Sequence, residues 1–214
     1  IKIMINKNAS SLVLTDNKRF LKAMLIYVPW LTGFSFKNPE TLIMAAAIFA
    51  MGGISLSLCS KITDYYIAHT NQEDLRSKIT GSFGRISTDL LMGNWEDTSL
   101  DEDMVEKGFL IGESFNLVNY VPLLAQVLIE LGNRQAEVIL EKHLEWSEMY
   151  ENDFGRLSYY THSSLYLLKY MEYRKALDKA NAGIEFISKN LGNKPGLLMI
   201  YSIKIRSTLP RRTC

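Results

Sequence analysis

The stretch IELGNR at residues 129–134 places a turn between two apolar helical patterns. Three further stretches have the same form, an apolar pair followed by a turn residue and then a polar or aromatic residue: FAMGG at 49–53, LLMGNW at 90–95 and LKYMEY at 168–173. The turn positions are Gly52, Gly93, Gly132 and Met171, which follow one another at nearly equal intervals. An interval of about 40 residues that recurs along a chain is typical of a structural repeat.

A second set of breaks falls about half a period after each of these turns, at residues 69–71, 112–114, 151–153 and 190–193. A helix, a tight turn, a second helix and a looser turn therefore recur with one period. Because a helical hairpin alone cannot bury its apolar face, we expect neighbouring hairpins to stack. The sequence thus predicts an all-α fold, an α-solenoid of stacked antiparallel helix pairs with a period of about 40 residues.

The period divides the chain into three parts. Residues 1–38 are expected to form an N-terminal extension with an initial helix, 39–208 a helical repeat array of about four hairpins, and 209–214 a tail. The expected helices cover residues 16–31, 39–51, 54–69, 73–92, 101–112, 117–131, 134–150, 154–170, 172–190 and 196–208. Strand-period alternation extends over no useful length, so we predict no sheet.

The composition, 47% hydrophobic and 22% charged, is that of a globular protein. A net charge of +1 without a basic stripe argues against a general nucleic-acid binder. With two cysteines, Cys59 and Cys214, and no secretory signal, a reducing compartment is favoured, and we predict a cytoplasmic protein. The chain begins at Ile1 and ends abruptly, so we expect a fragment of a larger protein.

One segment supports an alternative, a membrane-embedded helical protein with a span at residues 41–60. This segment carries no charge, and a span of about 20 residues is long enough to cross a bilayer. It is, however, rich in alanine, glycine and serine, and Gly52-Gly53 interrupts it with a helix stop. Asn38-Pro39 before it resembles a helix N-cap followed by proline in the first turn. We therefore favour a buried helix over a membrane span.

The stretch YMEYRKAL at 170–177 resembles the centre of a tetratricopeptide repeat, in which a small residue and an aromatic precede the alanine that starts the second helix. Ala180 fits the close-packed position four residues after Ala176. The period exceeds the length of about 34 residues that is typical of that family. Met171 also replaces the turn glycine, so the resemblance is to a divergent, long-helix variant.

Such arrays resemble the C-terminal regulatory arms of ATPase-coupled signalling proteins such as soluble class III nucleotide cyclases. The resemblance implies a non-catalytic interaction and regulatory segment of a larger intracellular signalling protein, with a protein similar to soluble adenylyl cyclase as one candidate.

We find no motif for catalysis, a cofactor or a metal ion, and predict that this segment is not an enzyme. Its three histidines are not spaced as a metal-binding pair, and the acidic stretch at 97–106 lacks the spacing and glycine of a calcium loop. His143 lies mid-helix among apolar residues, where we expect a histidine at the core edge, bonded to a neighbour. A helical enzyme with a site at His143 or His162 is the third, least favoured hypothesis.

The expected partner is another protein or another domain of the same chain, with neither nucleic acid nor a membrane expected. Tyrosines are dense in the last third of the sequence, and tyrosine is enriched in binding hot spots. The candidate protein-binding residues are Tyr159, His162, Tyr166 and Tyr170. We expect the binding surface to be concave and to be formed mainly by the first helix of each pair.

Overall fold

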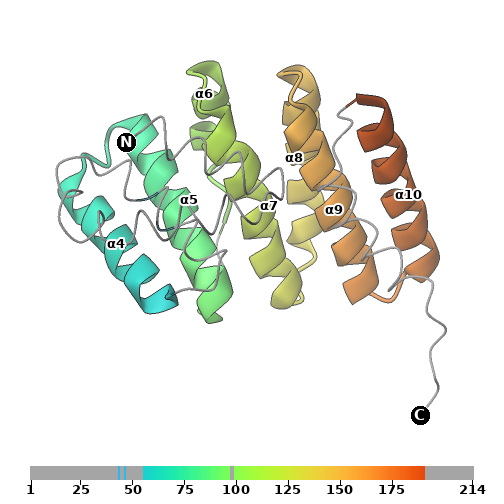
Figure 1. Cartoon of the computed structure of the whole chain (residues 1–214), viewed down its shortest axis with the longest axis horizontal. Coiled ribbons are helices and arrows are strands. Elements are labelled where there is room, and N and C mark those ends of the chain that lie inside the picture. Colours follow the sequence, from blue (N-terminus) through green and yellow to red (C-terminus); the bar gives the residue numbers. More distant parts are fainter. Residues whose placement is uncertain (1–42, 44–45, 47–54, 97–98, 191–214) are drawn as a thin grey trace, which may run out of the picture. The chain divides into compact units, whose positions relative to one another are not determined.

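The computed structural model describes residues 43, 46, 55–96 and 99–190 (Figure 1). All regular structure in these residues is α-helical. The helices are α4 (Leu56–His69), α5 (Leu75–Met92), α6 (Glu102–Leu110), α7 (Ser114–Glu130), α8 (Gln135–Met149), α9 (Asp153–Lys169) and α10 (Tyr173–Asn190). The predictions for residues 1–38, the turn at Gly52, the helix at 196–208 and the tail lie outside the described residues.

The described helices belong to two compact units, which are considered separately. The first comprises the chain up to Asn94 together with Asp103–Asn116, and the second comprises Trp95–Glu102 together with the chain from Leu117 onward. The predicted helix boundaries are confirmed to within three residues for all seven helices. The largest difference is at α7, which begins at Ser114 instead of residue 117.

Short polar side chains cap three of the helices at their N-termini. Ser55 accepts a hydrogen bond from the backbone N–H of Leu58 at 3.3 Å, and Asp74 accepts one from Ser77 at 2.9 Å. Asn152 does the same for Gly155 at 2.9 Å. Each cap satisfies one of the N–H groups that the first helical turn leaves without a partner, which fixes where α4, α5 and α9 begin.

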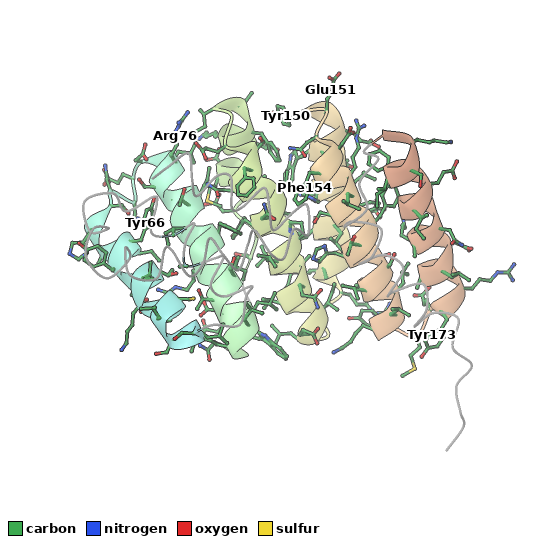
Figure 2. All side chains as sticks on the ribbon, viewed as in Figure 1. Tyr66, Arg76, Tyr150, Glu151, Phe154 and Tyr173 are labelled. Carbon is green, nitrogen blue, oxygen red and sulfur yellow. The ribbon has the colours of Figure 1, made fainter. Side chains whose placement is uncertain are left out.

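In the first unit, α4 packs against α5. Tyr66 of α4 is fully buried (Figure 2), and it faces α5 at Gly81, where an added Cβ would stand 3.7 Å from the tyrosine ring. Arg85 of α5 forms an ion pair with Asp64 of α4 at the surface. Burial of the aromatic ring is the larger contribution here, because exposed ion pairs stabilise by only about 0–1 kcal/mol.

In the second unit, α9 packs against both α8 and α10, and these neighbours are visible side by side in Figure 1. The contact between α9 and α10 centres on Leu157, Ala180 and Ile187, all buried. The contact between α8 and α9 is close at Gly155, where an added Cβ would lie only 2.2 Å from Ser147 Oγ. A side chain at Gly155 would therefore push α8 and α9 apart.

Residues in the left-handed backbone conformation end five successive helices. They are Gly93 (φ 75°), Gly112 (φ 83°), Gly132 (φ 73°), Glu151 (φ 51°) and Met171 (φ 64°). Gly93, Gly132 and Met171 follow one another at equal intervals, and the same interval separates Gly112 from Glu151. The turns predicted at Gly93, Gly132 and Met171 are thus confirmed.

Hydrogen bonds of one type close the turns at Gly132 and Met171. The backbone N–H of Asn133 donates to the Leu128 carbonyl at 2.8 Å, and that of Glu172 donates to the Leu167 carbonyl, also at 2.8 Å. These are the bonds of a Schellman motif, which satisfies the last carbonyls of a helix and reverses the chain. Met171 therefore has the same backbone role as Gly132, the turn residue one period before it.

Within the described residues, no helix combines the length and the apolar character needed to cross a membrane. Most of residues 41–60 lies outside this part of the chain.

The left-handed residues give a direct test of the cost of these turns. A non-glycine residue in this conformation costs about 1–2 kcal/mol, partly offset because glycine is more flexible when unfolded. We expect Glu151→Gly and Met171→Gly each to raise the free energy of unfolding by about 0.5–1 kcal/mol, measured by equilibrium urea denaturation. Glu151 points away from the helices (Figure 2), so its side chain contributes no packing that the substitution would remove.

The matched control is Glu145→Gly, the same change at an exposed position inside α8, which should lower the free energy of unfolding by about 1 kcal/mol. A decrease at Glu151 as large as that at Glu145 would contradict the assigned role of Glu151.

Candidate functional site

A groove runs along α9 between α8 and α10 in the second unit. It has a volume of about 450 Å³, within the range of roughly 300–1,000 Å³ typical of ligand sites. The residues that line it are Glu137, Leu140 and Glu141 of α8, Ser163, Tyr166 and Leu167 of α9, and Lys175, Asp178, Lys179 and Ala182 of α10. The groove thus has a partly apolar floor on α9 and charged walls on the two flanking helices.

The first wall is fixed by a tyrosine from the floor. The Tyr166 hydroxyl donates a hydrogen bond of 3.0 Å to Glu137 Oε2. Burial and this bond to the carboxylate raise the pKa of Tyr166 to about 12, so the phenol remains a neutral donor at physiological pH. The bond orients the Glu137 carboxylate without cancelling its charge, because the donor is uncharged.

A second tyrosine connects both walls through α9. The Tyr159 hydroxyl donates to Glu141 Oε1 at 2.6 Å and accepts a hydrogen bond from Lys179 Nζ at 2.7 Å. The Lys179 ammonium also stands 4.7 Å from the centre of the Tyr159 ring, a cation–π contact. Burial, with the nearby Glu141 carboxylate, raises the pKa of Tyr159. Tyr159 therefore holds one residue of α8 and one of α10 in place.

Tyr170 lies at the C-terminal end of α9, beside the turn after α7. Its hydroxyl donates to the Gly132 carbonyl at 2.7 Å, and the Arg134 guanidinium stands 4.9 Å from the centre of its ring. The rings of Tyr166 and Tyr170 are 4.7 Å apart. These contacts tie the end of α9 to the Gly132 turn, and Tyr170 does not line the groove.

Two of the histidines, His143 of α8 and His162 of α9, interact with each other between these two packed helices. His143 of α8 is fully buried. Its ring nitrogens make no hydrogen bond of regular geometry with the described residues, but the ring interacts with the backbone of Gly155 in α9, which acts to raise the pKa of His143. Burial, with a smaller effect from His162, lowers the pKa of His143 to about 3. The ring is neutral at physiological pH and acts as part of the core.

His162 is partly buried, and its Nδ1 lies 2.8 Å from the carbonyl oxygen of Ser158, one turn earlier in α9. Burial lowers the pKa of His162, while the interaction with the Ser158 carbonyl opposes that shift. The side chain does not line the groove. Over the described ranges, no cluster of histidine, cysteine and acidic side chains is arranged to hold a metal ion.

Of the four candidate residues, Tyr166 lines the groove and Tyr159 holds two of its charged residues. The charged walls themselves, Glu137 and Glu141 on one side and Lys175 and Lys179 on the other, were not among the candidates. Each pair is spaced by four residues and so occupies one face of its helix. That spacing is the only sequence signal, and it does not reveal which helix lies opposite.

The link through the Tyr159 hydroxyl predicts the effect of removing it. Tyr159→Phe should lower the free energy of unfolding by about 1–2 kcal/mol, since the hydroxyl serves a carboxylate and an ammonium group. Tyr160→Phe is the matched control, because no hydrogen bond of the Tyr160 hydroxyl occurs in the described residues, and it should change stability by under about 0.5 kcal/mol. Equal effects of the two substitutions in urea denaturation would contradict the link.

The buried His143 ring predicts a pH dependence of stability. Its pKa is about 3 when folded and 6.5 in the reference state, so between these values the unfolded chain binds the additional proton. The contribution of His143 to the free energy of unfolding is therefore fully present above pH 6.5 and is lost as the pH falls toward 3. From pH 7.5 to 5, this group should remove roughly 2 kcal/mol from the free energy of unfolding. His143→Leu should lose correspondingly less over that interval, and parallel profiles would contradict the assignment.

Comparisons with known proteins identify no relative of this chain. No protein-family model, no curated protein and no solved structure matches the chain. The function of the groove has to be inferred from its own geometry and charge.

Proposed function

We propose that this chain is a non-catalytic protein-interaction segment that binds a peptide segment of a partner in the groove along α9. The observation that carries the proposal is the groove itself, about 450 Å³ in volume, with apolar Leu140 and Leu167 beside oriented polar groups. Apolar surface together with a few fixed polar groups is what binding sites offer a ligand. The partner is another protein or another domain of the same chain.

The proposed architecture behind this groove is an α-solenoid of antiparallel helix pairs. Its support is the recurrence of left-handed turn residues at one constant interval and the packing of α9 against both α8 and α10. In a solenoid each repeat contacts only its neighbours, and the exposed helices form an extended binding surface. Here the walls of the groove come from α8 and α10, each expected as the second helix of a pair, and its floor comes from the first helix α9.

The place of this segment in a larger intracellular signalling protein, such as a soluble class III nucleotide cyclase, is proposed from the resemblance of the repeat sequence alone. A regulatory role would follow if the segment bound in the groove belonged to another domain of the same protein.

A library of random twelve-residue peptides displayed on phage tests the proposed function. We expect it to yield peptides whose binding is lost in Ala182→Trp, because the indole would fill the groove from an exposed position on α10. The control is the same change at Ala68, an exposed residue of α4 outside the groove, which should leave binding unchanged. Recovery of no peptide, or of peptides equally sensitive to both substitutions, would overturn the proposal.

A further inference from the structure

The charges in the groove are not balanced. Three carboxylates line it, those of Glu137, Glu141 and Asp178, against the ammonium groups of Lys175 and Lys179. Lys175 pairs with Glu172 at 2.5 Å, outside the lining, and Lys179 donates to the Tyr159 hydroxyl at 2.7 Å. Among the residues that the structure describes, none of the three carboxylates makes a direct ion pair, and Glu137 interacts with Lys175 only over a longer distance, where it helps to raise the pKa of that lysine. The groove therefore presents excess negative charge.

The two carboxylates of α8 are also held in fixed positions. Glu137 accepts from Tyr166 and Glu141 accepts from Tyr159, both neutral phenols. Each carboxylate retains lone pairs for further donors, since an ionised carboxylate accepts up to about four hydrogen bonds. Two oriented acceptors that still carry their charges are suited to cationic donors, which form the stronger, charge-assisted type of hydrogen bond.

The floor of the groove adds no charge. Ser163 lines the groove and is buried, and its side chain interacts with the Tyr159 hydroxyl, where it opposes the larger effects that raise the pKa of Tyr159. The other floor residues, Tyr166 and Leu167, are also uncharged. The excess negative charge therefore comes from the walls.

From these three observations we infer that the groove binds a basic segment of a partner protein, with two arginine or lysine side chains on Glu137 and Glu141. This inference rests on the proposed function and specifies its ligand. The aliphatic stems of such side chains pack on Leu140, Leu167 and the Tyr166 ring while their charged ends reach the carboxylates. Arginine suits the site better than lysine because its planar group binds a carboxylate through two parallel bonds.

The spacing of the acceptors restricts the ligand further. Glu137 and Glu141 are one helical turn apart, which places their Cβ atoms about 5–6 Å apart. Two basic residues match this distance when they are three or four positions apart on a helix, or two apart in an extended strand. A nucleic acid or an anionic membrane carries the wrong sign of charge for this groove.

Fluorescence anisotropy with three labelled helical peptides of one design tests the inference on the 214-residue chain. The peptides carry arginine, glutamine or glutamate at two positions four residues apart and are otherwise identical. We expect the arginine peptide to bind at least about tenfold more tightly than the glutamate peptide, with the glutamine peptide between them, and the preference to shrink as salt rises.

Two double variants with the same change of charge locate the binding. Glu137→Gln with Glu141→Gln keeps the shape of the side chains and their acceptors for the tyrosine hydroxyls. It should weaken the binding of the arginine peptide by about tenfold or more. Glu145→Gln with Glu148→Gln removes two exposed charges from the same helix outside the groove, and should weaken binding by less than about twofold. Thermal unfolding followed by circular dichroism verifies that both variants are folded.

Equal weakening by the two double variants, or tighter binding of the glutamate peptide, overturns the inference. Failure of the inference can be separated from failure of the proposed function. If phage selection yields acidic or uncharged peptides that Ala182→Trp blocks, a peptide groove exists and only its basic specificity is refuted. If no peptide from either source binds in a way that Ala182→Trp blocks, both are refuted.

Discussion

The reversal of the chain by left-handed residues is the constraint on which the rest of the structure depends. At Gly93, Gly112, Gly132, Glu151 and Met171, one residue with positive φ ends a helix and directs the chain back. The nearly constant spacing of these residues limits the number of residues available to each helix and its turn. From α7 to α10 the helices are of similar length, 15 to 18 residues, so residues at corresponding positions of neighbouring helices lie at similar heights. The groove along α9 is a consequence of this regularity.

In the second unit, apolar packing and polar contacts along α9 have different roles. One face contributes the apolar contact of Leu157 with Ala180 and Ile187, which excludes water and supplies most of the stabilisation. The close approach at Gly155 lets α8 and α9 come near enough for the Tyr159 hydroxyl to reach Glu141. The polar contacts set the position of the groove walls more than they stabilise the fold, since a typical hydrogen bond contributes about 1 kcal/mol net.

Much of the fold could be predicted because its signals are local. The helices and the turns at Gly93, Gly132 and Met171 follow from apolar periodicity and from a repeated form of turn. The left-handed conformation of Glu151 could not be predicted, since glutamate gives no indication of positive φ, although a break was expected there. Its position one full period after Gly112 is the signal that was available.

The site was harder to predict than the fold because it depends on which helices face each other. Tyr166 was a candidate through the density of tyrosines, and it does line the groove. Tyr170 was a candidate for the same reason, and His162 was one because it lies in a polar stretch of a helix, but neither of them lines the groove. Glu137 and Glu141 lie on one face of α8 by their spacing, yet only the packing of α8 on α9 shows that tyrosines hold them. Such contacts join residues 18 and 29 positions apart, beyond the reach of periodicity.

The choice of donor gives the groove its electrostatic character. A lysine or arginine in direct contact with Glu137 or Glu141 would hold the carboxylate equally well but would neutralise it. A tyrosine hydroxyl orients the carboxylate and leaves its charge in place, since burial and the nearby carboxylate keep the phenol protonated. An interface between helices that served only packing would have no need of two carboxylates that are held in place by neutral phenols and make no direct ion pair, whereas a surface that receives a cationic side chain would.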